Sequence, residues 1–236
     1  MSLFKFKQFT VEQERCAMKI GTDAVLLGAW CPVDNNPNLI LDIGAGTGIL
    51  SLMLAQRTLA EQIDAIEIEP NAYEQCTDNF ENCNWSDRLF CFHAGLDEFV
   101  AEPEDEYDLI ISNPPFYTDN FKSDNKSRDL ARFEDALPFA ELIEATALLL
   151  SEKGYFVVII PFKEQKHFVL ECECFALYPF KITTIKGTLT ADIKRSLLAF
   201  SRINGTCEVD ELVIEKERHM YTTKYIALTK DFYLKM

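Results

Sequence analysis

Residues 39–48 read LILDIGAGTG, an apolar run that passes directly into three glycines at alternate positions. Glycine lets the backbone turn tightly and approach a ligand without a Cβ in the way. The residues that follow, ILSLMLAQRTL, have the apolar content and the length of a helix. This stretch therefore predicts a buried strand, a turn formed by Gly44, Gly46 and Gly48, and a helix.

The same alternation continues along the chain. Short apolar runs such as IDAIEI, YDLIIS and GYFVVIIP are separated by helix-length amphipathic segments. Apolar strands divided by helices are typical of a parallel sheet that is covered on both faces. We expect an α/β fold with a doubly wound, seven-stranded, mostly parallel sheet. Residues 179–203 contain two β-rich runs around a polar connection, which predicts an antiparallel hairpin at the sheet edge.

The length and the order of these segments predict one domain over residues 1–236. Within it we expect an N-terminal arm (1–38), a catalytic core (39–203) and a C-terminal extension (204–236). Aromatic residues alternate in the arm at Phe4, Phe6 and Phe9, which indicates a small β element.

Three local signals concern the ends of helices. Thr22 precedes DAVLLGAW and is a candidate N-cap. Gly154 follows LLLSEK and is a candidate C-cap. The spacing of apolar residues in the C-terminal tail predicts a helix that is capped by Thr222 or Thr223.

Composition predicts a soluble, cytoplasmic protein. No charged-then-apolar leader opens the sequence, and no apolar run approaches the roughly 18 residues that cross a bilayer. The eight cysteines form no C-x-x-C pair, and the three histidines do not complete a metal-finger spacing. We therefore expect reduced, packed thiols, no metal, no membrane association and no stable protein partner.

The net charge of −15 argues against a protein that coats nucleic acid, because nonspecific affinity for phosphates comes mainly from Lys and Arg. One basic run stands out, FKSDNKSRDLAR, with Lys122, Lys126, Arg128 and Arg132. Such a run is either a solvated loop or a localised contact with phosphates.

The spacing of the glycines distinguishes between cofactors. A dinucleotide-binding turn has the pattern G-x-G-x-x-G, whose third glycine would fall at Ile49. The chain instead has D-x-G-x-G-x-G, with Asp42 two residues before the first glycine. An acidic residue about 20 positions further on is the expected partner of a ribose diol. Glu67 lies at that place, and its neighbour Glu69 is the less favoured candidate.

Together, LDIGAGTG, Glu67 and the sequence NPPF at residues 113–116 resemble the class I S-adenosylmethionine-dependent methyltransferases. The resemblance implies a Rossmann-like fold and S-adenosylmethionine as cofactor, bound by Asp42, the three glycines and Glu67. The alternative is an ordinary strand–helix turn in which the glycines serve backbone geometry alone.

The same resemblance implies that NPPF marks enzymes that methylate a planar nitrogen. The Asn113 side-chain oxygen and the Pro114 carbonyl would each accept one N–H of an exocyclic amine, and so align it with the methyl group. Pro115 would stiffen the loop, and Phe116 would stack on the target ring. The alternative is a structural turn in which Asn113 caps and Phe116 packs into the core.

Adenine N6, guanine N2 and the glutamine side-chain nitrogen share this chemistry. The chain as a whole resembles the bacterial tRNA(Val) adenine-37 N6-methyltransferases, through FKQFTVEQERCAMKIGTDAVLLGAW, NPPF, RDLAR and YTTKYIALTKDFYL. This resemblance implies methylation of N6 of adenine 37 in the anticodon loop of a valine tRNA. The alternatives are a guanine N2 rRNA methyltransferase, a glutamine N5 protein methyltransferase and a noncatalytic binder of cofactor or RNA.

The resemblance also assigns residues outside the central motifs. It implies that Gly21, Thr22 and Asp23 close over the methionine end of the cofactor, where the alternative is a plain helix cap. It places an acidic residue after the third strand, against the cofactor's adenine amine. Leu96 stands at the aligned position, so the candidates are the next residue, Asp97, and a backbone group.

The basic run also matches the resemblance, because Arg128 and Arg132 fall in its R-x-x-A-R pattern. This favours contacts with RNA phosphates over a bare solvated loop. Lys122 and Lys126 precede these arginines in the same run and are assigned to the same surface.

Overall fold

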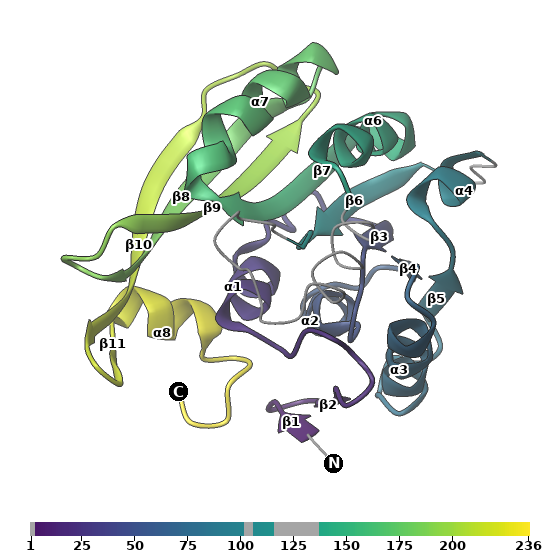
Figure 1. Cartoon of the computed structure of the whole chain (residues 1–236), viewed down its shortest axis with the longest axis horizontal. Coiled ribbons are helices and arrows are strands. Elements are labelled where there is room, and N and C mark those ends of the chain that lie inside the picture. The colour runs from purple at the N-terminus through teal and green to yellow at the C-terminus, as the bar shows by residue number, and fades with distance from the viewer. Residues whose placement is uncertain (1–2, 102–105, 116–136) are drawn as a thin grey trace, which may run out of the picture.

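A nine-stranded sheet runs through the computed structural model, which describes residues 3–101, 106–115 and 137–236 (Figure 1). Neighbouring strands follow the order β11-β10-β8-β9-β7-β6-β3-β4-β5. The five from β7 to β5 are parallel, and β9 is antiparallel to its two neighbours. The strands are β3 (Leu39–Ile43), β4 (Gln62–Glu67), β5 (Leu89–His93), β6 (Tyr107–Ser112), β7 (Leu150–Pro161), β8 (Tyr178–Thr188), β9 (Ile193–Ser201), β10 (Glu208–Glu217) and β11 (Met220–Tyr221).

The winding direction reverses between β3 and β6. From β3 the chain moves outward to β4 and β5, and it then returns to form β6 on the other side of β3. Such a reversal leaves a crevice at the carboxyl ends of the two central strands, where doubly wound sheets bind ligands. Ser112, the last residue of β6, lies opposite Ile43, the last residue of β3. Asn113 and Gly44 therefore enter the same crevice from adjacent strands.

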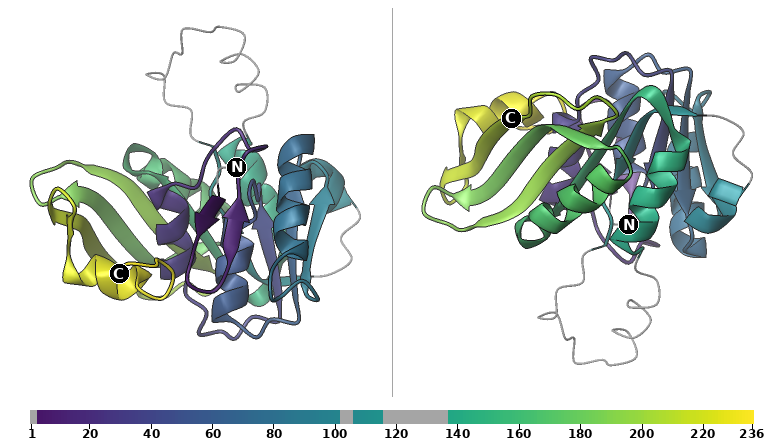
Figure 2. Two further views of the ribbon diagram at one scale, coloured as in Figure 1. Left: turned by 90° about the horizontal axis from the view of Figure 1, so that it is seen from below. Right: turned by 90° about the horizontal axis from the view of Figure 1, so that it is seen from above.

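Helices cover both faces of the sheet (Figure 2). Successive residues of a strand point to opposite faces. In β7, Val157 and Ile159 belong to one buried cluster, whereas Phe156 and Val158 belong to the other. No helix in the three described ranges is long and apolar enough to cross a bilayer. The first cluster includes residues of α1 (Thr22–Trp30), α2 (Ile49–Arg57), α3 (Pro70–Glu81) and α8 (Thr223–Thr229). The second includes residues of α6 (Phe139–Leu149) and α7 (Gln165–Cys174), and the partly buried residues of α4 (Leu96–Ala101) pack against it.

The expected α/β fold with a doubly wound, mostly parallel sheet is confirmed, but its edge differs from the prediction. Within the described residues the sheet has nine strands, because β10 and β11 of the C-terminal extension add to the seven expected ones. The β8–β9 hairpin is antiparallel as predicted, yet it lies inside the sheet, since β10 pairs with β8. The physical reason is that β10 has its own buried residue, Leu212, which packs with the core.

Two of the predicted helix ends are wrong. Thr22 is the first helical residue of α1, and Gly21 is the N-cap. Helix α6 ends at Leu149 and passes directly into β7, so Gly154 lies within a strand. Close packing explains why position 154 is a glycine, because a Cβ there would lie 2.8 Å from the carbonyl oxygen of Tyr107. The third prediction is confirmed, since the Thr222 hydroxyl accepts a hydrogen bond from the third helical N–H of α8.

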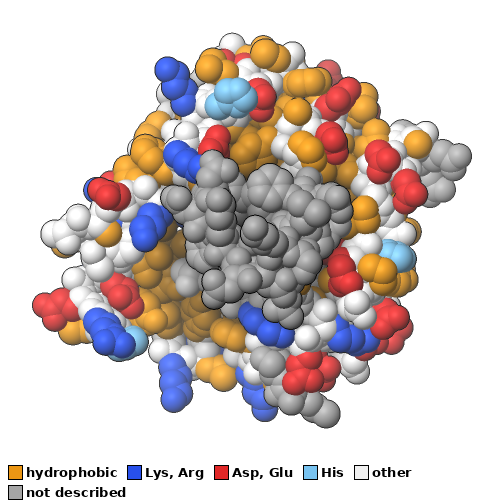
Figure 3. Space-filling view, viewed as in Figure 1, with side chains coloured by type: hydrophobic (Ala, Val, Ile, Leu, Met, Phe, Trp, Pro, Cys, Tyr) orange, Lys and Arg blue, Asp and Glu red, His pale blue; other side chains and the backbone are white. Residues whose placement is uncertain are grey.

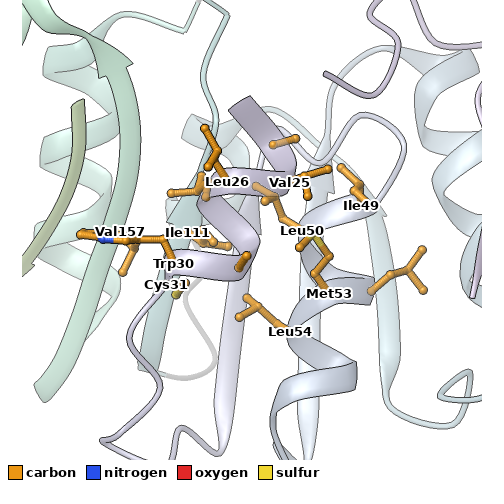
Figure 4. Packing of buried hydrophobic residues seen from close by; sticks show 14 of the residues in the cluster. Val25, Leu26, Trp30, Cys31, Ile49, Leu50, Met53, Leu54, Ile111 and Val157 are labelled. Carbon is orange, nitrogen blue, oxygen red and sulfur yellow. The ribbon is translucent and has the colours of Figure 1, made fainter. Parts of the chain in front are cut away.

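Helices α1 and α2 approach each other closely in front of the sheet (Figure 4). The approach depends on Gly28, where a Cβ would lie 2.7 Å from Met53 Sδ and 3.1 Å from Met53 Cβ. The fully buried Val25 on α1 and the nearly buried Leu50 on α2 belong to the same cluster. This contact fixes α1 against the helix that follows the glycine turn.

The N-terminal arm forms the predicted small β element and then runs along α3. Strands β1 (Leu3–Lys5) and β2 (Thr10–Glu12) pair in antiparallel fashion. The arm is held by Asn79 of α3, whose side-chain amide nitrogen donates to the Glu12 carbonyl and to the Thr47 carbonyl, both at 2.9 Å. Its oxygen accepts from the Glu12 N–H, also at 2.9 Å. One buried amide thus connects the arm, α3 and the glycine turn.

Replacing Asn79 with Ala should lower the free energy of unfolding by about 2–4 kcal/mol, because one buried and two part-buried backbone groups lose their hydrogen-bond partner. Urea denaturation measures this loss. The control is Asn84→Ala, since Asn84 is exposed and its substitution should change stability by no more than about 0.5 kcal/mol. Equal stabilities of the two variants would contradict the role given to Asn79.

Candidate functional site

The glycine turn after β3 has the geometry that its sequence predicts. Gly44, Gly46 and Gly48 have φ values of 73°, 56° and 75°, in the left-handed region that favours glycine. A Cβ on Gly44 or Gly46 would meet no atom of the described residues within 4 Å. At Gly48 it would lie 2.5 Å from a ring carbon of Phe80. The first two glycines therefore border open space, and the third allows α3 to pack against the turn.

Glu67 at the end of β4 reaches across to this turn. One carboxylate oxygen accepts the Gly46 N–H at 2.7 Å, and the other accepts the Glu69 N–H at 2.9 Å. Glu69 has a different role, because its side chain accepts the Ala72 N–H at 2.7 Å and caps α3. Only Glu67 of the two acidic candidates thus lies on the glycine turn.

Asp42 lies beneath the turn and is fully buried. Its Oδ2 accepts hydrogen bonds from the Ser51 hydroxyl at 2.7 Å and from the Ser51 N–H at 3.1 Å. Its Oδ1 has no hydrogen-bond partner among the described residues. Burial raises the pKa of this carboxyl to about 7, despite the opposing bonds from Ser51. The site therefore contains a buried acceptor with one unused oxygen.

A second rim of the crevice follows β5, where Asp97 is exposed in the first turn of α4. The nearest atoms to a Cβ built on Gly95 would be Asp97 Oδ1, at 2.7 Å, and Ile68 Cδ1, at 3.6 Å. Ile68 is 60% exposed, which is unusual for an apolar residue that follows a buried strand. An apolar face and a carboxylate thus lie together beside the end of β4.

Gly21, Thr22 and Asp23 lie at the start of α1, on the far side of the crevice. The Asp23 carboxylate accepts from Arg195 Nε of β9 at 2.8 Å. Arg195 pairs in the sheet with Pro161, the last residue of β7. The ion pair therefore holds the N-terminus of α1 at the same end of the sheet as the glycine turn, where the parallel strands terminate.

The motif NPPF begins at the end of β6. The Ser112 hydroxyl donates to the Ile43 carbonyl at 2.9 Å, which joins the ends of β6 and β3. Asn113 and Pro115 are half-buried, and Pro114 is buried. Phe116 lies outside the described residues.

The four residues assigned to RNA also lie outside the described part of the chain, so the structure does not place them; they are Lys122, Lys126, Arg128 and Arg132. Among the residues that are described, no three His, Cys, Asp or Glu side chains are grouped so as to hold a metal ion.

Two residues near the site were not found from the sequence. Cys16 of the arm is buried, and the pKa of its thiol is raised to about 11 chiefly by burial, with a contribution from the charge of Glu67. Asn79 anchors the arm, as described above. One sequence signal could have identified Asn79. Gln75 and Asn79 are four residues apart on the buried face of α3, where they interrupt an otherwise apolar stripe.

Comparisons with known proteins identify the fold and the family. The family model of the methyltransferase small domain matches residues 20–175. Among solved structures, a predicted O-methyltransferase from Agrobacterium tumefaciens aligns with a TM-score of 0.68 at 18% identity, covering 89% of this chain and 96% of that one. The ribosomal protein L11 methylase of Lactobacillus delbrueckii aligns with a TM-score of 0.53 at 16% identity, covering 77% of each chain. At these low sequence identities, the structural similarity shows a shared fold and nothing more.

The sequence relatives are much closer. A protein of Flavobacterium psychrophilum named tRNA1(Val) (adenine(37)-N6)-methyltransferase is 67% identical over 99% of this chain and 100% of its own length. A protein of the same name from Flavobacterium johnsoniae is 65% identical over the same shares. With its glycine turn, its acidic strand ends and its NPPF motif, the chain belongs to the tRNA1(Val) (adenine(37)-N6)-methyltransferase family of S-adenosylmethionine-dependent enzymes.

Proposed function

We propose that the protein transfers a methyl group from S-adenosylmethionine to the exocyclic N6 of adenine 37 in the anticodon loop of a valine tRNA. The observation that carries the proposal is the position of Asn113 and Pro114, at the reversal of the sheet and beside Gly44. The names of relatives that align over their whole length support the same substrate.

The residues around the glycine turn fit the cofactor. A ligand can approach the backbone of Gly44 and Gly46 closely, since a Cβ built on either would meet no described atom within 4 Å. Glu67 lies where a ribose diol would be recognised, and each of its oxygens retains a further lone pair beyond its bond to the N–H of Gly46 or Glu69. The unused Oδ1 of Asp42 is suited to the cationic methionine end.

The residues on the two sides of the crevice would hold the two ends of the cofactor. Asp97 would accept from the adenine amine while Ile68 packs against the ring, since both border one space beside β4. Gly21, Thr22 and Asp23 would close over the methionine end, because the ion pair with Arg195 holds them at this edge. When bound, the cofactor supplies an activated methyl group on a sulfonium centre.

Asn113 and Pro114 would hold the substrate. An adenine amine is a weak nucleophile because its lone pair is delocalised into the ring. Acceptance of its two N–H bonds by the Asn113 side-chain oxygen and the Pro114 carbonyl would orient the amine toward the methyl group, and orientation is the main catalytic contribution. The rings of Pro114 and Pro115 limit backbone motion at these acceptors. Phe116 would stack on the adenine.

The basic run with Lys122, Lys126, Arg128 and Arg132 would bind the phosphates of the same loop. Anticodon-loop bases are unpaired, so little stacking energy opposes the entry of one base into the crevice. These assignments complete a site that binds RNA despite the acidic composition of the chain.

Incubation with labelled cofactor and unmodified valine tRNA tests the proposal directly. We expect N6-methyladenosine in the nuclease digest, measured by mass spectrometry, and none when position 37 is guanine. Release factor and ribosomal RNA serve as competing substrates. Label found only in protein, or only on guanine N2, would refute the proposed substrate.

Asn113→Ala should reduce kcat by about 10²–10³-fold, by analogy with the removal of one preorganised hydrogen-bonding group from an active site. Cofactor affinity, measured by calorimetry, should remain within about twofold, because the substituted group contacts the amine and not the cofactor. Turnover that matches the wild type would eliminate Asn113 as an acceptor of the amine.

Cofactor affinity should weaken as the pH falls below about 7, because the pKa of Asp42 is raised to about 7 and its protonated form cannot pair with a cation. The limiting change is about tenfold per pH unit. Asp42→Asn should bind the cofactor more weakly at pH 8 and show little change in affinity between pH 7 and 5.5. Parallel pH profiles for the two proteins, measured by calorimetry, would contradict this pairing.

A further inference from the structure

An aromatic side chain is exposed where the chain leaves β7. Phe162 opens the short 3₁₀ helix η1 (Phe162–Glu164) and is 39% exposed. Because β7 is the neighbour of β6 and Val158 lies opposite Ser112, Phe162 lies at the same end of the sheet as Asn113, four residues beyond the level of Ser112. An exposed ring beside a site for a nucleobase is able to stack on another base.

Cationic side chains are carried by η1 itself and by the neighbouring elements α7 and β9. Lys163 follows it, Lys166 lies in the first turn of α7, and Lys194 lies at the start of β9 beside Arg195, which pairs with the end of β7. The side chain of Lys163 is 57% exposed, and Lys166 and Lys194 are also exposed. These residues lie on three elements at the same end of the sheet, and Lys194 and Arg195 point to opposite faces of β9. They are called here the β7–β9 rim: Phe162, Lys163, Lys166, Lys194 and Arg195.

The carboxylates at this rim neutralise only part of its charge. Glu164 lies 3.4 Å from Lys163, and Asp23 pairs with Arg195. Asp192, in the β8–β9 connection, is exposed. In the described ranges Lys166 and Lys194 form no ion pair, so both ammonium groups are available to an anionic partner.

The other half of this end of the sheet, toward α3 and α4, is acidic. It carries the carboxylates of the β4 end and of the helices α3 and α4, and Arg15 of the arm is already paired with two of them. In Figure 3 blue side chains lie among red ones toward α7 and β9, whereas the side toward α4 carries mainly red ones. The acidic residues are Glu67, Glu69, Glu74, Asp78, Asp97 and Glu98.

We propose that the RNA substrate lies across the β7–β9 rim, with phosphates on Lys166 and Lys194 and an unpaired base next to the target stacked on Phe162. This inference rests on the proposed function and adds the direction in which the RNA leaves the site. The charge difference along the edge excludes the opposite course, over α3 and α4, where phosphates meet carboxylates.

The rim is held in place before RNA binds. The Ser196 hydroxyl of β9 donates to the Gln165 side-chain oxygen at the start of α7, at 2.6 Å, and Ser196 is fully buried. This bond connects the two elements that carry Lys194 and Lys166. Little ordering is therefore needed when the phosphates bind, which favours affinity.

The test compares two double charge reversals of equal net charge. Lys166→Glu with Lys194→Glu should weaken the binding of unmodified valine tRNA by roughly 10–100-fold and lower the slope of log Kd against log salt concentration by about 2, the value for two lost phosphate contacts. Lys153→Glu with Lys235→Glu is the control, because both residues are exposed and neither lies on the rim. Equal effects of the two pairs overturn the proposal.

Phe162→Ala should raise the KM for tRNA about tenfold without changing cofactor affinity, and Phe162→Tyr should restore it, because a phenol ring stacks as well as a phenyl ring. An unchanged KM overturns the stacking role. RNA binding is measured without cofactor, so its outcome is independent of methyl transfer. If the wild-type protein binds tRNA at the rim but does not methylate it, the proposed function is wrong and the proposed binding surface still holds.

Discussion

The parallel pairing of β3 with β6 is the constraint on which the rest of the site depends. It brings the ends of two strands that are about 70 residues apart in sequence to the same level, and the Ser112 hydroxyl bonded to the Ile43 carbonyl joins them there. Gly44 continues from one strand and Asn113 from the other. The glycine turn and the start of the NPPF motif thus lie side by side because a single register is fixed.

Much of this arrangement could be predicted because its signals are local. A buried strand, a turn that needs positive φ and a helix follow one another within residues 39–57, and each has a distinct residue pattern. The preference for Glu67 over Glu69 also has a local reason, since Glu67 is the last residue of the strand whereas a carboxylate directly before Pro70 caps the helix.

The remaining features depend on contacts between distant segments. The ion pair of Asp23 with Arg195 joins residues 172 positions apart, and nothing near Thr22 distinguishes a cap from the first helical residue. Gly154 was mistaken for a helix end because the close approach of Tyr107 is visible only once β6 and β7 are paired. The two extra strands were missed since β10 has few buried residues and depends on β8 for its partner.

The shared amide of Asn79 makes the N-terminal arm part of the binding equilibrium. The same side chain holds the carbonyl of Thr47, inside the glycine turn, and the backbone of Glu12, in the arm. Whatever orders one of these segments lowers the entropic cost of ordering the other, and such coupling is reciprocal. Substitutions in the arm can therefore alter how tightly the enzyme holds a molecule that those residues never touch.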